Sequence, residues 1–143
     1  MAYVVGAVLA LLTYALGKVA GFDRDRAFYA TILIVVGHYY VLFAAEAGST
    51  SALIAELAGM TVFVALAVAG FKFTPWLIPA GLAGHGVFDL VHGYLVTNPG
   101  VPTWWPAFCG TYDVVIGAAV ATLLIRGRAN QQRGATASVS SVT

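Results

Sequence analysis

One ten-residue segment, residues 84–93, holds two histidines and an aspartate among apolar residues and glycines. His85, Asp89 and His92 follow the spacing i, i+4, i+7, and steps of roughly 100° per residue place all three within an arc of about 60° on one helical face. Imidazole nitrogens and carboxylate oxygens are common metal ligands. The pair Asp89 and His92 also has the i, i+3 spacing of carboxylate and histidine that builds metal sites inside helix bundles. The segment therefore predicts a metal-binding helix face.

Three more ionisable residues, His38, Glu56 and Asp113, lie within other apolar stretches. Charged groups in hydrocarbon are costly unless they are paired, so such residues usually mark a functional site. We expect the metal ligands to be the histidines and the nearby aspartate: His38, His85, Asp89 and His92. Glu56 and Asp113 are the expected catalytic residues, each acting as a general base where it is not itself a ligand.

A single ion is not expected to bind the whole helix face. His85 and His92 are separated by about 10.5 Å of helix rise, so one ion would take Asp89 and His92 together with Glu56, Asp113 or His38. A second ion between His85 and His38 is the alternative arrangement.

The composition places these residues in a membrane. The chain has 143 residues, of which 60% are hydrophobic and 9% are charged, and its mean hydropathy is +0.87. A soluble core of this size cannot bury so much apolar surface. Five apolar stretches have about the 20 residues that a bilayer requires: Ala2–Ala20, Ala27–Ala45, Ser51–Gly70, Pro75–Thr97 and Pro106–Ile125. The sequence predicts an all-α integral membrane five-helix bundle, with residues 1–126 as one domain.

The basic residues predict the orientation of this bundle. All seven lie beside the first or third expected connection or in the tail: Lys18, Arg24, Arg26, Lys72, Arg126, Arg128 and Arg133. The second and fourth connections have none. The positive-inside rule then places the N-terminus outside and the C-terminus in the cytoplasm. The polar residues 127–143 are expected to form a disordered cytoplasmic tail.

This orientation gathers the intramembrane polar residues in one layer. Counted inward from the outer helix ends at about 1.5 Å per residue, Glu56 and His92 are the shallowest at about 7–8 Å and His85 is the deepest at about 18 Å, with the other three between them. The cytoplasmic halves of the same helices contain almost no charge. We therefore expect one polar site in the outer half of the bilayer.

Cys109 is the only cysteine, which excludes an intramolecular disulfide and a metal site built from several thiolates. It precedes Asp113 by one helical turn and shares its face. Inert packing and a soft ligand at the edge of the site both remain open for it.

Two blocks, residues 84–93 and Trp104-Trp105-Pro106-Ala107-Phe108-Cys109-Gly110-Thr111-Tyr112-Asp113, together resemble a family of small bacterial multi-helix integral membrane proteins of unknown function. The resemblance implies a multi-pass protein of the bacterial inner membrane and carries no activity. The chain is more loosely similar to seven-helix hydrolases of the alkaline ceramidase and adiponectin-receptor type, whose zinc is held by transmembrane His and Asp. It lacks their Ser-x-x-x-His and His-x-x-x-His patterns.

The functional hypothesis is a polar site that binds a divalent metal ion, zinc or iron, and serves a hydrolase or oxidoreductase acting on a lipid or another membrane-soluble substrate. A haem-binding electron-transfer subunit, with haem between His38 and His92, is one alternative. A small proton- or ion-handling membrane protein is another. Membrane lipid is the expected partner, a homo-oligomer remains open, and nothing indicates nucleic-acid binding.

Overall fold

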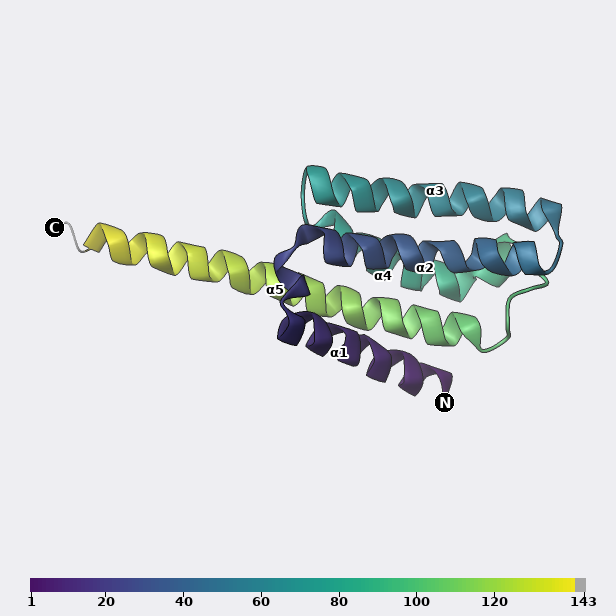
Figure 1. Cartoon of the computed structure of the whole chain (residues 1–143), viewed down its shortest axis with the longest axis horizontal. Coiled ribbons are helices and arrows are strands. Elements are labelled where there is room, and N and C mark those ends of the chain that lie inside the picture. Colours follow the sequence, from purple (N-terminus) through teal and green to yellow (C-terminus); the bar gives the residue numbers. More distant parts are fainter. Residues whose placement is uncertain (141–143) are drawn as a thin grey trace.

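The computed structural model describes the backbone of residues 1–140 and the side chains of residues 1–25 and 27–129. These residues form five α-helices, one short 3-10 helix and no strand (Figure 1). The elements in chain order are α1 (Ala2–Ala20), η1 (Phe22–Arg24), α2 (Arg26–Glu46), α3 (Thr50–Lys72), α4 (Leu77–Leu95) and α5 (Trp105–Ser140). The all-helical fold with five α-helices is confirmed.

Four of these helices, α1, α2, α3 and α5, are long and apolar enough to cross a membrane. The fourth helix in the chain, α4, does not belong to this group. Its two histidines, its aspartate and its glycines make it less apolar than its neighbours, although Pro75–Thr97 was expected to be a span. The N-terminus-outside orientation stays a prediction.

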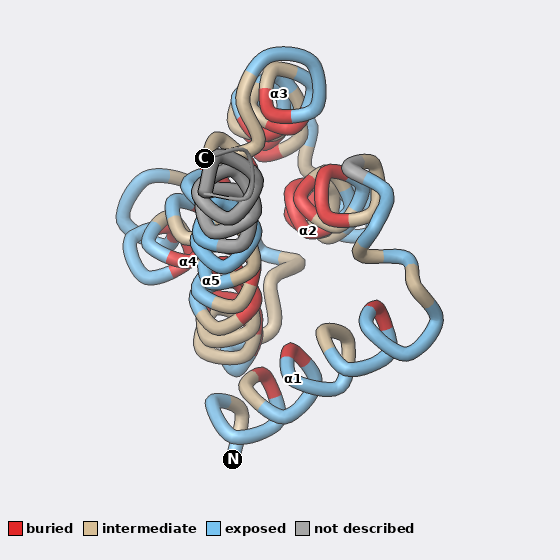
Figure 2. Tube along the Cα trace, turned by 90° about the vertical axis from the view of Figure 1, so that its left-hand side faces the viewer, coloured by how far each residue is buried: buried red, intermediate tan, exposed pale blue. Residues whose placement is uncertain are grey.

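The helices are arranged around α5 (Figure 2), which packs against α4 on one side and against α1 on the other. Helix α2 pairs with α3, and α3 in turn contacts α4. The face of α4 that carries His85, Asp89 and His92 is buried in this arrangement. Helix α1 is peripheral, because its only buried residues are Gly6, Ala10 and Gly17.

Short connections turn the chain between the helices. Gly21 and Gly48 adopt positive φ angles of 76° and 65°, a conformation that glycine reaches without steric cost. The next helices are capped by side chains: Asp25 accepts a hydrogen bond from the amide of Ala27, and Ser49 accepts one from the amide of Ala52. Successive helices run in opposite directions, so the α2–α3 and α4–α5 connections lie at the same end of the bundle (Figure 1).

Helix α5 extends beyond the apolar span expected at Pro106–Ile125. The segment 127–143, for which disorder is expected, is helical as far as Ser140, and the last three residues lie outside the described part of the chain. The segment contains alanine, arginine and glutamine, which have high helix propensity, so the helix can continue past the end of the apolar span.

Helices α4 and α5 approach each other closely at a pair of glycines, Gly86 and Gly110. A Cβ atom added to Gly86 would lie 2.8 Å from the Gly110 carbonyl oxygen and 2.9 Å from Val114 Cγ2. Both distances are too short for carbon, so a side chain here would push the two backbones apart. Small residues allow this kind of close helix contact in membrane proteins.

We expect Gly86→Ala to separate α4 from α5 and to destabilise the protein by about 1–3 kcal/mol, the usual cost of overpacking. The matched control is Gly84→Ala, because an added Cβ at Gly84 meets nothing within 4 Å. Thermal unfolding in mild detergent measures both variants. Equal midpoints for the two would show that the glycine contact does not set the helix separation.

Candidate metal centre

The close contact of α4 and α5 brings together four side chains that can bind a metal ion. His85 and Asp89 come from α4 and are one turn apart, and Cys109 and Asp113 have the same i, i+4 relation on α5. All four are buried, with at most 2% of each residue exposed. Their ligand atoms lie within 4.8 Å of one another. This group is called the four-residue cluster below.

His85 lies at the centre of the cluster. Its Nδ1–H donates to Asp113 Oδ2 at 2.6 Å and lies 3.6 Å from Asp89 Oδ2. The Cys109 thiol makes the longest contact, donating to Asp113 Oδ2 at 3.7 Å. Metal bonds of about 2.0–2.3 Å place the ligand atoms of a tetrahedral site roughly 3–4 Å apart. Small side-chain rotations would therefore bring the donors onto one ion.

The cluster has more carboxylate oxygens than hydrogen-bond donors. Asp89 Oδ2 and Asp113 Oδ1 are buried and have no hydrogen-bond partner. Among the described side chains, both carboxylates form ion pairs only with His85. Buried polar atoms in native proteins are nearly always satisfied, and a buried charge needs a partner of opposite sign. A cation bound between the two aspartates would supply what both oxygens lack.

Tyr40 of α2 fixes the remaining oxygen of Asp89. Its hydroxyl donates to Asp89 Oδ1 at 2.6 Å, and its ring stacks on His92 with centroids 3.8 Å apart and an interplanar angle of 13°. Sequence reasoning missed this residue. Tyr40 and its neighbour Tyr39 are the same residue type in the same apolar stretch. Only the rotation of α2 about its axis in the folded protein decides which of the two reaches Asp89.

A second polar group, formed by Glu56, His92 and Asn98, adjoins the cluster through this stack. The His92 Nε2–H donates to Glu56 Oε1 at 2.7 Å. Asn98, in the α4–α5 connection, donates from Nδ2 to the same oxygen at 2.9 Å and to the Tyr40 carbonyl at 3.0 Å. Asn98 was also missed from the sequence, since a loop asparagine carries no distinctive signal. We refer to this group as the Glu56 triad.

The structure divides the six expected site residues between the four-residue cluster, the Glu56 triad and His38, which stands alone. His85, Asp89 and Asp113 meet in the four-residue cluster, where Cys109 joins them. Glu56 and His92 bind each other in the Glu56 triad, so Asp89 is grouped with His85 and not with His92 as its i, i+3 spacing predicted. Cys109 was identifiable from its one-turn spacing to Asp113, although the sequence left its role open.

His38 belongs to neither group. It is half-buried, and its Nδ1–H donates to the Ile34 carbonyl of its own helix at 2.6 Å. A histidine in a membrane helix can satisfy itself in this way without a ligand. The haem alternative required His38 and His92 to face one group, but Nε2 of His92 is bonded to Glu56 and its ring is covered by Tyr40.

Comparisons with protein-family models, with curated proteins and with solved structures find no match for this chain. The two sequence blocks singled out above, residues 84–93 and 104–113, supply the cluster. Function is therefore argued from the geometry of these residues.

Tyr40→Phe removes the hydroxyl that binds Asp89 and leaves a third buried carboxylate oxygen without a donor. We expect the free energy of unfolding in mild detergent to fall by about 1–3 kcal/mol. Tyr94→Phe is the matched control, because Tyr94 is 91% exposed. An unchanged unfolding midpoint in Tyr40→Phe would mean that the hydrogen bond does not contribute to the fold.

Proposed function

We propose that this protein is an integral membrane protein that binds one divalent metal ion, zinc or iron, through His85, Asp89 and Asp113. The observation that carries the proposal is the pair of buried carboxylate oxygens without hydrogen-bond partners beside one imidazole nitrogen. An ion bound at His85 Nδ1 would replace the proton now shared with Asp113 Oδ2. The two carboxylates and the imidazole are ligands that both zinc and iron accept.

Charge balance favours Cys109 as a neutral neighbour of the ion. Two ionised aspartates compensate a divalent cation, and the site is then uncharged in its apolar surroundings. A thiolate would add a third negative charge to a buried site, which is costly. The long contact between Sγ and Asp113 Oδ2, 3.7 Å, agrees with a thiol that borders the site without bonding strongly to it.

Three protein ligands and a fourth open position are typical of catalytic metal sites. A divalent ion held by His85, Asp89 and Asp113 would supply Lewis-acid activation of water near neutral pH. We propose that the site hydrolyses a membrane-soluble ester or amide. Water would add its hydroxyl to the carbonyl carbon, the bond from that carbon to the leaving oxygen or nitrogen would break, and the remaining hydrogen of the water would pass to the leaving group. Glu56, the base expected from the sequence, is held by His92 and Asn98 in the Glu56 triad.

The ligand set also supports an iron-dependent redox reaction as a second candidate, since a mixed shell of histidine and carboxylate is typical of non-haem iron sites. The identity of the bound metal distinguishes the hydrolytic function from the redox function. A homo-oligomer in the membrane is compatible with both.

Elemental analysis of protein purified in mild detergent tests the metal site. We expect about one zinc or iron ion per chain and a loss of about tenfold or more in His85→Gln and Asp113→Asn, which each remove a ligand. His38→Gln is the matched control, because His38 bonds only to its own helix. Wild-type protein that holds no metal after incubation with Zn²⁺ or Fe²⁺ would overturn the proposal.

Cobalt substitution tests the role of Cys109. The three-ligand site predicts that the Co²⁺ form lacks an intense thiolate-to-cobalt charge-transfer band and that Cys109→Ser retains about one ion per chain. A strong near-ultraviolet band that disappears in Cys109→Ser would instead establish a closed site with four protein ligands, which is typical of structural zinc.

A further inference from the structure

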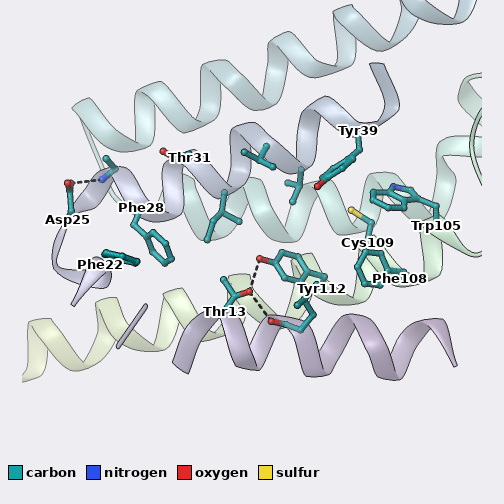
Figure 3. Close-up of a pocket in the computed structure, with 15 residues that line it drawn as sticks. Thr13, Phe22, Asp25, Phe28, Thr31, Tyr39, Trp105, Phe108, Cys109 and Tyr112 are labelled. Carbon is teal, nitrogen blue, oxygen red and sulfur yellow. Dashed lines mark hydrogen bonds between the residues drawn. The ribbon is translucent and has the colours of Figure 1, made fainter. Parts of the chain in front are cut away.

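An apolar cavity of about 490 Å³ lies between α1, α2 and α5 (Figure 3). Its wall includes Leu9 of α1, Ile32 and Val36 of α2, and Phe108 of α5. The cavity exists because α1 and α4 both pack on α5 while α2 packs mainly on α3. Its volume is within the range of about 300–1,000 Å³ that ligand pockets usually have.

The cavity is long. Its lining residues on α2 run from Ala27 to Tyr39, which is roughly 18 Å along the helix axis. Most of its lining side chains are apolar, so an extended hydrocarbon chain matches both its length and its surface.

The sides of the cavity open onto the surface that would face lipid. Leu9 of α1 is 43% exposed and Val35 of α2 is 47% exposed, although both line the cavity. In a bilayer this surface is surrounded by acyl chains, so a chain can enter sideways between α1 and α2 without crossing water. Phe22 and Phe28 line the end near the α1–α2 connection.

The opposite end of the cavity adjoins the four-residue cluster. Trp105, Tyr39 and Cys109 line this end (Figure 3). Cys109 belongs to both, because its thiol also contacts Asp113. The Trp105 Nε1–H is buried and has no hydrogen-bond partner. A rotation of the indole that brought this N–H to the cavity surface would let it donate to the carbonyl oxygen of an acyl group.

We propose that the cavity binds one acyl chain of a bilayer lipid, with the acyl carbonyl accepting a hydrogen bond from Trp105 beside Cys109 and the chain extending toward Phe28. This inference rests on the proposed function and names its substrate class: a long-chain acyl ester or amide drawn from the membrane. The carbonyl end of the chain would lie beside Cys109, which borders the four-residue cluster, and the tail would provide the binding energy through apolar contacts.

Photo-crosslinking in vesicles tests the site without measuring enzymatic activity. The full-length protein is reconstituted in phosphatidylcholine vesicles that contain a small fraction of phosphatidylcholine with a diazirine in its acyl chain. After irradiation, peptide mass spectrometry locates the labelled residues. We expect labelling to concentrate on cavity residues such as Leu9, Ile32 and Phe108. Labelling spread evenly over exposed residues of α3 would overturn the proposal.

A variant with a filled cavity is compared with a variant that carries the same substitution outside the cavity. Val36→Phe places a larger side chain in the cavity, and we expect it to reduce the cavity labelling several-fold. Val62→Phe is the control, since Val62 is 57% exposed on α3 and does not line the cavity. Ala27→Phe fills the other end of the cavity. It tests the same loss of labelling if Val36→Phe fails to fold. Wild-type labelling in a folded filled variant would exclude chain binding in the cavity.

Two further arms separate this proposal from the metal site. Trp105→Phe removes the free N–H, and we expect it to weaken competition by unlabelled palmitic acid and by unlabelled phosphatidylcholine by about threefold, the effect of one hydrogen bond. Asp113→Asn should lose metal and keep the cavity labelling. Cavity labelling in wild-type protein that holds no metal after incubation with Zn²⁺ or Fe²⁺ would leave the acyl-chain site standing and overturn the proposed function. Bound metal together with dispersed labelling would leave the metal site standing and overturn the acyl-chain site.

Discussion

The close approach of α4 and α5 at Gly86 and Gly110 is the constraint on which the site depends. Neither helix holds enough donors for an ion: α4 brings His85 and Asp89, and α5 brings Cys109 and Asp113. A Cβ at Gly86 would also come within 3.4 Å of Asp113 Cβ, so the same contact that joins the backbones sets the separation of the two aspartates. The position of α1 follows as well, because it packs on the opposite side of α5.

The second constraint is electrostatic. Five polar residues are buried in the described structure, Glu56, His85, Asp89, His92 and Asp113, and three of them are acids. The Glu56 triad is internally satisfied, since Glu56 receives two donors at one oxygen. The four-residue cluster is not, since two of its carboxylate oxygens lack a partner. This difference between two adjacent groups is the reason for proposing the ion at the four-residue cluster and not at the Glu56 triad.

The sequence predicted the helices better than the site. The expected span Ala2–Ala20 coincides with α1, and Ala27–Ala45 differs from α2 by one residue at each end, because hydrophobic length and turn residues are local signals. Helical spacing also placed His85 and Asp89 on one face. Their partners depend on how far each helix is rotated about its axis, which side-chain packing decides. Asp89 therefore joins His85, and His38 bonds to Ile34 in its own helix.

Asn98 has a consequence that reaches from the surface of the bundle to its interior. Its amide holds the Tyr40 carbonyl and Glu56 together, Glu56 holds His92, and the stacked rings of His92 and Tyr40 hold the hydroxyl on Asp89. Loop position and ligand position are thus thermodynamically linked. Linkage is reciprocal, so a molecule that stabilises the α4–α5 connection in this position raises the affinity for the ion by the same factor by which the ion raises the affinity for that molecule.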